Sequence, residues 1–150
     1  MVKNVTVREA RQKQSEGFVY IDVRSVQEFR YGHPAGAVNV PLLHHDERSG
    51  QMAPNRDFLA VMRAHFDLDA KLLIGCQVGG RSLQAAQVLA SAGFTDVSNV
   101  LGGFGGARDR MTGGRIAEGW TEAGLPVDSE TPERAYETLR SKVSERGSRT

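Results

Sequence analysis

Short apolar runs alternate along the chain with segments whose pattern is typical of helices, and this order restricts the fold more than any other feature. Chains of this kind form a parallel sheet that is covered by helices. The run at residues 71–75 is almost entirely apolar, which is typical of a strand at the centre of such a sheet. We therefore predict an α/β domain with a five-stranded, mostly parallel sheet. The strands are expected at residues 5–7, 18–21, 37–40, 71–75 and 97–101.

Two helices are predicted to begin at capping boxes, in which a Ser or Thr and a Glu three residues later exchange hydrogen bonds with the backbone. Thr6 and Glu9 form the first box, and Ser25 and Glu28 form the second. We expect the first helix to end at about Gln14. The spacing of apolar residues predicts further helices at residues 57–66, 82–92 and 131–143.

The remaining segments have the composition of loops. Residues 41–55 are polar and rich in turn formers, and we expect a surface loop without regular structure. The Gly-rich stretch at residues 102–114 predicts a mobile loop, broken by a short helix at most. We expect the charged tail at residues 144–150 to be disordered. The sequence has no internal repeat, so we place one domain at residues 1–128 and a C-terminal helix with its tail at residues 129–150.

The composition argues against several classes of protein. Nineteen Lys and Arg residues nearly balance 18 Asp and Glu residues, so the overall charge gives no case for binding nucleic acid or an acidic membrane surface. No apolar run approaches the roughly 18 residues of a membrane-spanning helix. The charged N-terminus is unlike a secretory signal, so we expect a cytoplasmic protein.

The single cysteine and the paired histidines bear on metal and disulfide sites. One cysteine cannot form an internal disulfide or a cysteine-rich zinc site. His44, His45 and Asp46 are the remaining candidate metal ligands, but neighbouring histidines in a polar loop are typically exposed. We therefore predict no metal site.

The sequence around Cys76 is the strongest candidate for chemistry. Cys76 follows the central apolar run and precedes a predicted helix, and ligands bind at this edge of an open α/β sheet. Gly79 and Gly80 allow a tight turn that points several backbone amides inward, and the helix that begins near Arg81 or Ser82 adds its positive end. A lone cysteine without such surroundings is usually an inert core residue. These surroundings stabilise a thiolate and therefore favour a nucleophile.

With these motifs in place, the sequence resembles the single-domain rhodaneses, a family of sulfurtransferases. The resemblance covers about residues 4–128 and implies a three-layer α/β/α rhodanese-like domain. The matching stretches are YIDVRSVQEFRYGHPAGAVNVP at residues 20–41, LIGCQVGGRSLQAAQVLASAGFTDVSNVLGG at residues 73–103 and GWTEAGLPV at residues 119–127.

The resemblance also implies a mechanism. Cys76 corresponds to the nucleophile that takes a sulfur atom from a small donor, such as thiosulfate or a polysulfide, and becomes a persulfide. The persulfide then passes its sulfur to cyanide, a thiol or a protein, and no metal or organic cofactor takes part. The backbone amides that would hold the persulfide belong to Gln77, Val78, Gly79, Gly80 and Arg81.

Loop size and loop charge bear on two alternatives to this hypothesis. The span from Cys76 to Arg81 is six residues, whereas phosphatases of related fold use a loop one residue longer. The other enzymes to consider are therefore small phosphatases and arsenate reductases of related fold. These enzymes remain the less favoured alternative. Gln77 and Val78 are neutral, whereas rhodaneses that use thiosulfate efficiently tend to carry basic residues there. This departure leaves the donor open and keeps the second alternative, a sulfur-carrier or regulatory interaction module.

Four further side chains are predicted to support the loop: Asp22, Arg24, Glu28 and Ser82. Arg81 has two candidate roles, binding an anionic donor or holding the loop by pairing with Asp22 or Glu28. We favour the second role, because a single arginine near the core usually seeks a carboxylate. Arg24 is expected to pair with Glu28, four residues along the same helix.

The Gly-rich stretch contains two arginines and precedes a second departure from the family pattern. Arg108 and Arg110 are expected to be solvated loop charges rather than donor-binding groups. Trp120 comes later than in most relatives, after an apparent insertion. That insertion could form a flap or partner surface beside Cys76, or be a tolerated loop.

Overall fold

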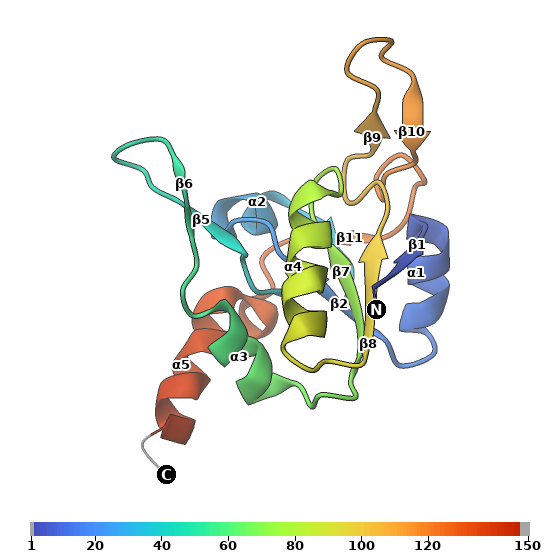
Figure 1. Cartoon of the computed structure of the whole chain (residues 1–150). Coiled ribbons are helices and arrows are strands. Elements are labelled where there is room, and N and C mark those ends of the chain that lie inside the picture. The colour runs from blue at the N-terminus through green and yellow to red at the C-terminus, as the bar shows by residue number, and fades with distance from the viewer. Residues whose placement is uncertain (1, 148–150) are drawn as a thin grey trace.

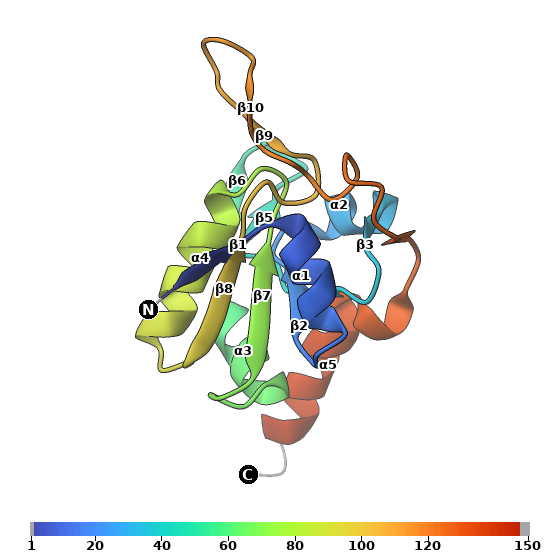
Figure 2. The same ribbon diagram turned by 90° about the vertical axis from the view of Figure 1, so that its right-hand side faces the viewer.

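Five parallel strands form the main sheet of the computed structural model, which describes residues 2–147 (Figures 1 and 2). Their order is β1-β8-β7-β2-β4, so β7 is central, and every neighbouring pair is parallel. The predicted α/β fold with a five-stranded sheet is therefore confirmed. The strands are β1 (Lys3–Val5), β2 (Val19–Asp22), β4 (Val38–Asn39), β7 (Lys71–Gly75) and β8 (Asp96–Val100).

Helices cover both faces of this sheet and complete three layers. The helix α1 (Val7–Gln14) lies on one face, where Phe29 of α2 (Val26–Tyr31) also packs. The opposite face carries α3 (Phe58–His65), α4 (Gly80–Ser91) and α5 (Tyr136–Gly147).

The alternation of side chains along β7 builds both halves of the core. Leu72 and Ile74 pack towards α3 and α4, whereas Leu73 packs towards α1, and all three are fully buried. Cys76 follows directly and belongs to the cluster on the α3 and α4 side. The sheet therefore aims the cysteine side chain at the face where α4 begins.

The element boundaries follow the caps that the sequence predicted. Both capping boxes are present, with the Thr6 side chain accepting from the Glu9 amide and the Ser25 side chain from the Glu28 amide. The first strand ends at Val5 instead of residue 7, because Thr6 serves as the N-cap of α1. The predicted strand at residues 71–75 is found with the same bounds.

Both segments that were predicted as irregular loops contain antiparallel hairpins, so those predictions are wrong. In the first, β5 (Leu43–His45) pairs with β6 (Met52–Pro54). In the Gly-rich segment, β9 (Ala107–Arg108) pairs with β10 (Arg115–Ala117), and no helix forms there. The Asp109 carboxylate accepts from the amides of Met111 and Thr112 and so shapes the turn of this second hairpin.

A further strand pair ties the C-terminal part of the chain to the domain. In this pair, β3 (His33–Pro34) runs antiparallel to β11 (Val127–Asp128). The predicted terminal helix begins instead as the 3₁₀ turn η1 (Pro132–Arg134), because Ala135 adopts an extended conformation that separates this turn from α5. The helix α5 continues to Gly147, past the residue at which we expected disorder to begin, and residues 148–150 of the predicted tail lie outside the described residues.

The last helix packs on the domain through its first turns. Tyr136 and Leu139 are buried among the core residues of α3, and His65 of α3 bonds the Leu139 carbonyl oxygen at 2.8 Å. Along residues 2–147, no helix is both long and apolar enough to cross a membrane.

Trp120, which comes late in the sequence, fills the core on the α1 face. Its side chain is fully buried and meets the Tyr20 ring edge-on, with 5.5 Å between the ring centroids. The indole Nε1–H donates to the Pro126 carbonyl at 2.7 Å. The insertion before Trp120 therefore leaves this aromatic contact intact while the hairpin of β9 and β10 projects from the fold (Figure 2).

The Tyr20 hydroxyl allows a test of this packing. It is buried, it has no hydrogen-bond partner among the described residues, and it occupies the space that a Cβ atom on Gly75 would need. We expect Tyr20→Phe to leave the free energy of unfolding within about 1 kcal/mol of the parent value, because no observed hydrogen bond is lost. We expect Gly75→Ala to lower it by about 2 kcal/mol or more through overpacking. Urea unfolding monitored by circular dichroism measures both values, and a larger loss for Tyr20→Phe than for Gly75→Ala would contradict this packing.

Candidate active site

The loop that follows β7 holds the thiol of Cys76 at the start of α4. The cysteine is 1% exposed, and its sulfur accepts a hydrogen bond from the Gly79 amide at 3.0 Å. The thiol is also 3.3 Å from the Ser82 hydroxyl, to which it donates. Because α4 begins at Gly80, rather than at the predicted Ser82, the positive end of the helix lies directly beside the sulfur.

The conformation of this loop depends on glycine. Gly79 has a φ angle of 121°, in the region that side chains disfavour, and it is the N-cap of α4. The sequence predicted that the amides of residues 77–81 form a cradle. In the described part of the chain, one of these amides, that of Gly79, donates a hydrogen bond to the sulfur. Val78 stands at the rim of the loop and is 55% exposed.

A second backbone segment supports the loop from the side. The Phe104 amide donates to the Cys76 carbonyl at 2.8 Å, and the Gly105 amide donates to the Gln77 carbonyl at 2.9 Å. Gly103 has a positive φ angle of 55°, and a Cβ atom there would collide with the Cys76 carbonyl. Gly103 is therefore needed for the close approach of this segment to the cysteine loop, a contact that spacing along the sequence does not reveal.

Arg24 joins the end of β2 to the loop. Its guanidinium donates from Nε and Nη2 to the Asp22 carboxylate, and the Nη2–Oδ2 distance is 2.7 Å. The same group donates to the Gly32 carbonyl and to Oε1 of Gln77, and it lies 4.4 Å from the centroid of the Phe104 ring. Four groups from four segments thus converge on one arginine that is 3% exposed.

The predicted pairing of Arg24 with Glu28 is wrong. The chain turns directly after β2, and the Arg24 amide bonds the Asp22 carboxylate at 3.0 Å, so the guanidinium folds back over Asp22. Asn39 holds this turn by donating to the carbonyls of Asp22 and Arg24. Glu28 is left free to pair elsewhere.

Arg81 forms an ion pair with Glu28, which is one of its two predicted partners. The two side chains form a bidentate pair with N–O distances of 2.7 and 3.1 Å. Burial alone would raise the pKa of Glu28, but the hydrogen bonds and charge of Arg81, together with the Ser25 donors, lower this pKa from 4.5 to about 2. The pair locks the first turn of α4 to α2.

Behind the sulfur lies a polar chain that the sequence analysis did not predict. The Ser82 hydroxyl is 2.7 Å from Oδ1 of Asn99, and Nδ2 of Asn99 donates to Oδ1 of Asn4 at 3.2 Å. Ser82 and Asn99 are buried. The one indication of this polar chain in the sequence was the polar pair Ser98-Asn99 inside a predicted strand that is otherwise apolar.

The other candidate groups stay outside the site. Arg108 pairs with Glu122 at 2.7 Å, and Arg110 lies in the turn of the β9 and β10 hairpin. His44 and His45 belong to β5, and the described residues contain no cluster of three metal-ligating side chains.

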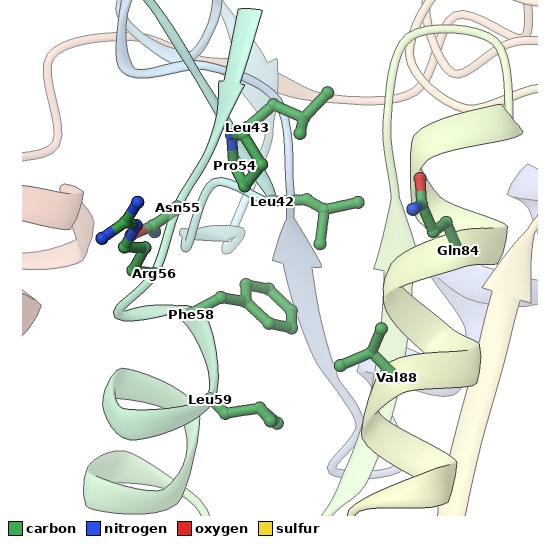
Figure 3. Close-up of a pocket in the computed structure, with 9 residues that line it drawn as sticks. All are labelled: Leu42, Leu43, Pro54, Asn55, Arg56, Phe58, Leu59, Gln84 and Val88. Carbon is green, nitrogen blue, oxygen red and sulfur yellow. The ribbon is translucent and has the colours of Figure 1, made fainter.

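An apolar hollow of about 220 Å³ lies between the β5 and β6 hairpin, α3 and α4 (Figure 3). Phe58 and Val88 approach each other across it, and Gln84, one turn into α4, closes one side. Cys76 does not line this hollow.

Comparison with known proteins identifies the family. The family model described as "Rhodanese-like domain" matches residues 6–108. The chain belongs to the rhodanese-like family. Thiosulfate sulfurtransferase 16, chloroplastic, from Arabidopsis thaliana is 36% identical over 124 residues, which cover 83% of this chain and 91% of the relative. The chain is thus similar over nearly the whole length of a protein named as a sulfurtransferase.

Two further matches agree. Senescence-associated protein DIN1 from Raphanus sativus is 38% identical over 126 residues, which cover 83% of this chain, but the chain spans only 60% of that relative's length. The crystal structure of Rv0390 from M. tuberculosis superposes with a TM-score of 0.68 at 31% identity, covering 85% of this chain and 97% of that chain. The predicted rhodanese family and its three-layer fold are confirmed.

The Arg81–Glu28 pair predicts a dependence of stability on pH. We expect Glu28→Gln to lower the free energy of unfolding by about 1–2 kcal/mol at pH 7, allowing for the partial exposure of the pair. The pKa of Glu28 is lowered to about 2 from 4.5, so this contribution is complete above pH 4.5 and is lost as the pH falls towards 2. Urea unfolding of both proteins across this range measures the difference.

The matched control is Glu137→Gln, which removes a carboxylate from a highly exposed pair with Arg30. We expect this control to resemble the parent at every pH. A difference between Glu28→Gln and the parent that stays constant from pH 7 to pH 2 would contradict the role of the ion pair.

Proposed function

We propose that this chain is a sulfurtransferase that carries sulfane sulfur on Cys76, from a small donor such as thiosulfate to a thiophilic acceptor. The observation that carries the proposal is the position of the Cys76 sulfur, which accepts from the Gly79 amide at the start of α4. Family membership and relatives named as thiosulfate sulfurtransferases support the same chemistry.

The first half-reaction forms the persulfide. The Cys76 thiolate attacks the outer sulfur of thiosulfate, a new S–S bond forms, and the bond to the sulfonate sulfur breaks. Sulfite leaves with the electron pair of that bond. The Gly79 amide and the N-terminal end of α4 stabilise negative charge at the cysteine before attack and on the outer sulfur afterwards.

The second half-reaction regenerates the enzyme. A nucleophile such as cyanide or a thiolate attacks the outer sulfur of the persulfide, and the S–S bond breaks with its electron pair returning to Cys76. Cyanide leaves as thiocyanate, and no net oxidation of the protein occurs. The persulfide form of the enzyme links the two half-reactions, and a covalent intermediate of this kind predicts ping-pong kinetics.

The neighbouring charges argue against a phosphatase or arsenate reductase. A phosphatase needs a carboxylic acid that can protonate the leaving group. The two carboxylates beside the loop, Asp22 and Glu28, are each engaged in a bidentate pair with an arginine. The span from Cys76 to Arg81 is also one residue shorter than in phosphatases of related fold. Sulfur transfer fits both features.

The same pairs bear on the choice of donor. Arg24 and Arg81 are already neutralised by Asp22 and Glu28, and the residues after the cysteine are neutral. A doubly charged donor such as thiosulfate therefore meets little free positive charge. This observation favours a second candidate function, a sulfur carrier that forms the persulfide but delivers the sulfur to a protein.

An intact-mass measurement tests the persulfide. We expect incubation with thiosulfate to add about 32 Da to the protein, one sulfur atom, because Cys76 is the only cysteine. Cys76→Ser serves as the control and should gain no mass. Thiocyanate formed after addition of cyanide measures the second half-reaction.

The outcomes separate the candidate functions. A sulfur adduct with sustained thiocyanate formation supports the enzyme, whereas an adduct with negligible turnover favours the carrier. No adduct from thiosulfate, polysulfide or mercaptopyruvate, together with cysteine-dependent phosphatase activity, would overturn the proposal.

The account of the donor predicts an effect of added charge at the rim. We expect Val78→Arg to lower the KM for thiosulfate roughly fivefold, because an exposed cation near the loop attracts the dianion with about 1 kcal/mol. Steady-state thiocyanate formation measures this change. The neutral variant Val78→Gln is the matched control, and equal KM values for the two variants at low salt would contradict the prediction.

A further inference from the structure

The Ser82 hydroxyl has one proton and three acceptors around it. Its oxygen lies 2.7 Å from Oδ1 of Asn99, 3.1 Å from the Gly79 carbonyl and 3.3 Å from the Cys76 sulfur. A hydroxyl can donate to only one of these groups at a time. The shortest contact is the one to Asn99, so the amide oxygen competes with the sulfur for this proton.

The fold sets the orientation of the Asn99 amide. Asn99 is on β8, where it lies opposite Asn4 of β1 and beside Ile74 of β7. The Asn99 Nδ2 donates to Oδ1 of Asn4 at 3.2 Å. This bond turns the other end of the Asn99 amide, its own Oδ1, towards Ser82. The side chain is 2% exposed, so water does not readily replace either bond.

This arrangement satisfies the thiol better than the thiolate. In the thiol form, the Cys76 S–H donates to Ser82, the Ser82 O–H donates to Asn99, and Asn99 donates to Asn4. In the thiolate form, Ser82 either keeps its bond to Asn99 and withholds a donor from the sulfur, or turns to the sulfur and leaves the buried Asn99 oxygen unpaired. Each choice has a free-energy cost.

We propose that Asn99 is a positioning residue that sets, through Ser82, how readily Cys76 gives up its proton and becomes the attacking thiolate. The inference deepens the proposed function, since it rests on Cys76 being the nucleophile. It concerns a residue that does not touch the sulfur and is linked to it by a single hydroxyl.

The charged groups around the sulfur do not provide the same control. Arg81 on α4 is paired with Glu28 of α2, and Arg24 is paired with Asp22 at the end of β2, so each pair carries no net charge. Among the described residues, Tyr20 of β2 also interacts electrostatically with Cys76, and burial raises the pKa of its hydroxyl well above 10 and keeps it neutral. The Ser82 hydroxyl is therefore the neighbouring group whose hydrogen bond can change between Asn99 and the sulfur.

Alkylation by iodoacetamide tests the proposal, because the chain has a single cysteine. The rate constant is measured against pH for the parent, Asn99→Leu and Asn99→Asp. Leu cannot accept the Ser82 proton, so we expect the pH of half-maximal rate to fall by about one unit. Asp accepts it more strongly and adds negative charge, so we expect a rise of about one unit or more.

A second pair of variants separates the proposed link from a general change in packing. In a Ser82→Ala background, Asn99→Leu should no longer move the pH of half-maximal rate, because the shared hydroxyl is gone. Asn4→Ala, at an exposed position, should shift the parent profile in the same direction as Asn99→Leu but less, because the amide is then free to turn. If the Asn99 variants do not fold, the alkylation profile of Asn4→Ala tests the proposal in their place.

Three outcomes would overturn the proposal: unchanged profiles in folded Asn99 variants, shifts of the same sign for Leu and Asp, or a Leu shift that persists without the Ser82 hydroxyl. An unchanged profile for Asn4→Ala overturns it when the Asn99 variants are unfolded. Alkylation needs no sulfur donor, so failure of these tests is distinct from failure to form a persulfide.

Discussion

The buried ion pair between Arg24 and Asp22 connects the parts of the molecule that carry the cysteine loop. The guanidinium also bonds Gly32 at the end of α2 and the side chain of Gln77, and the ring of Phe104 lies over it. Removing one partner from such a pair leaves an uncompensated buried charge, at a cost of about 3–5 kcal/mol. The position of the loop therefore depends on contacts among segments that are far apart in the sequence.

The proposed reactivity of Cys76 rests on backbone geometry more than on side-chain charge. The sulfur lies at the start of α4 and accepts from Gly79, while the Arg81–Glu28 pair holds the first turn of the helix in place. Gly103 permits the next segment to bond the Cys76 carbonyl. A site built in this way stabilises an anionic sulfur with fixed dipoles and leaves little free positive charge to select a donor.

The local pattern of the sequence was enough to predict the strand at residues 71–75, both capping boxes and the place of Cys76 between strand and helix. These features depend on neighbouring residues. The partner of Arg24, the support from residues 103–105 and the Asn99–Ser82 contact depend on how distant strands align, so spacing alone could not reveal them. The two hairpins were missed because their strands are only two or three residues long and lie within segments rich in polar residues or glycine.

A crystal structure of thiosulfate-treated protein would show whether the loop holds a persulfide on Cys76. We expect electron density for one additional sulfur atom bonded to the Cys76 sulfur, with backbone amides of residues 77–81 directed at it. Density for an unmodified thiol, in crystals whose dissolved protein has gained one sulfur atom by mass, would place the added sulfur elsewhere and contradict the account.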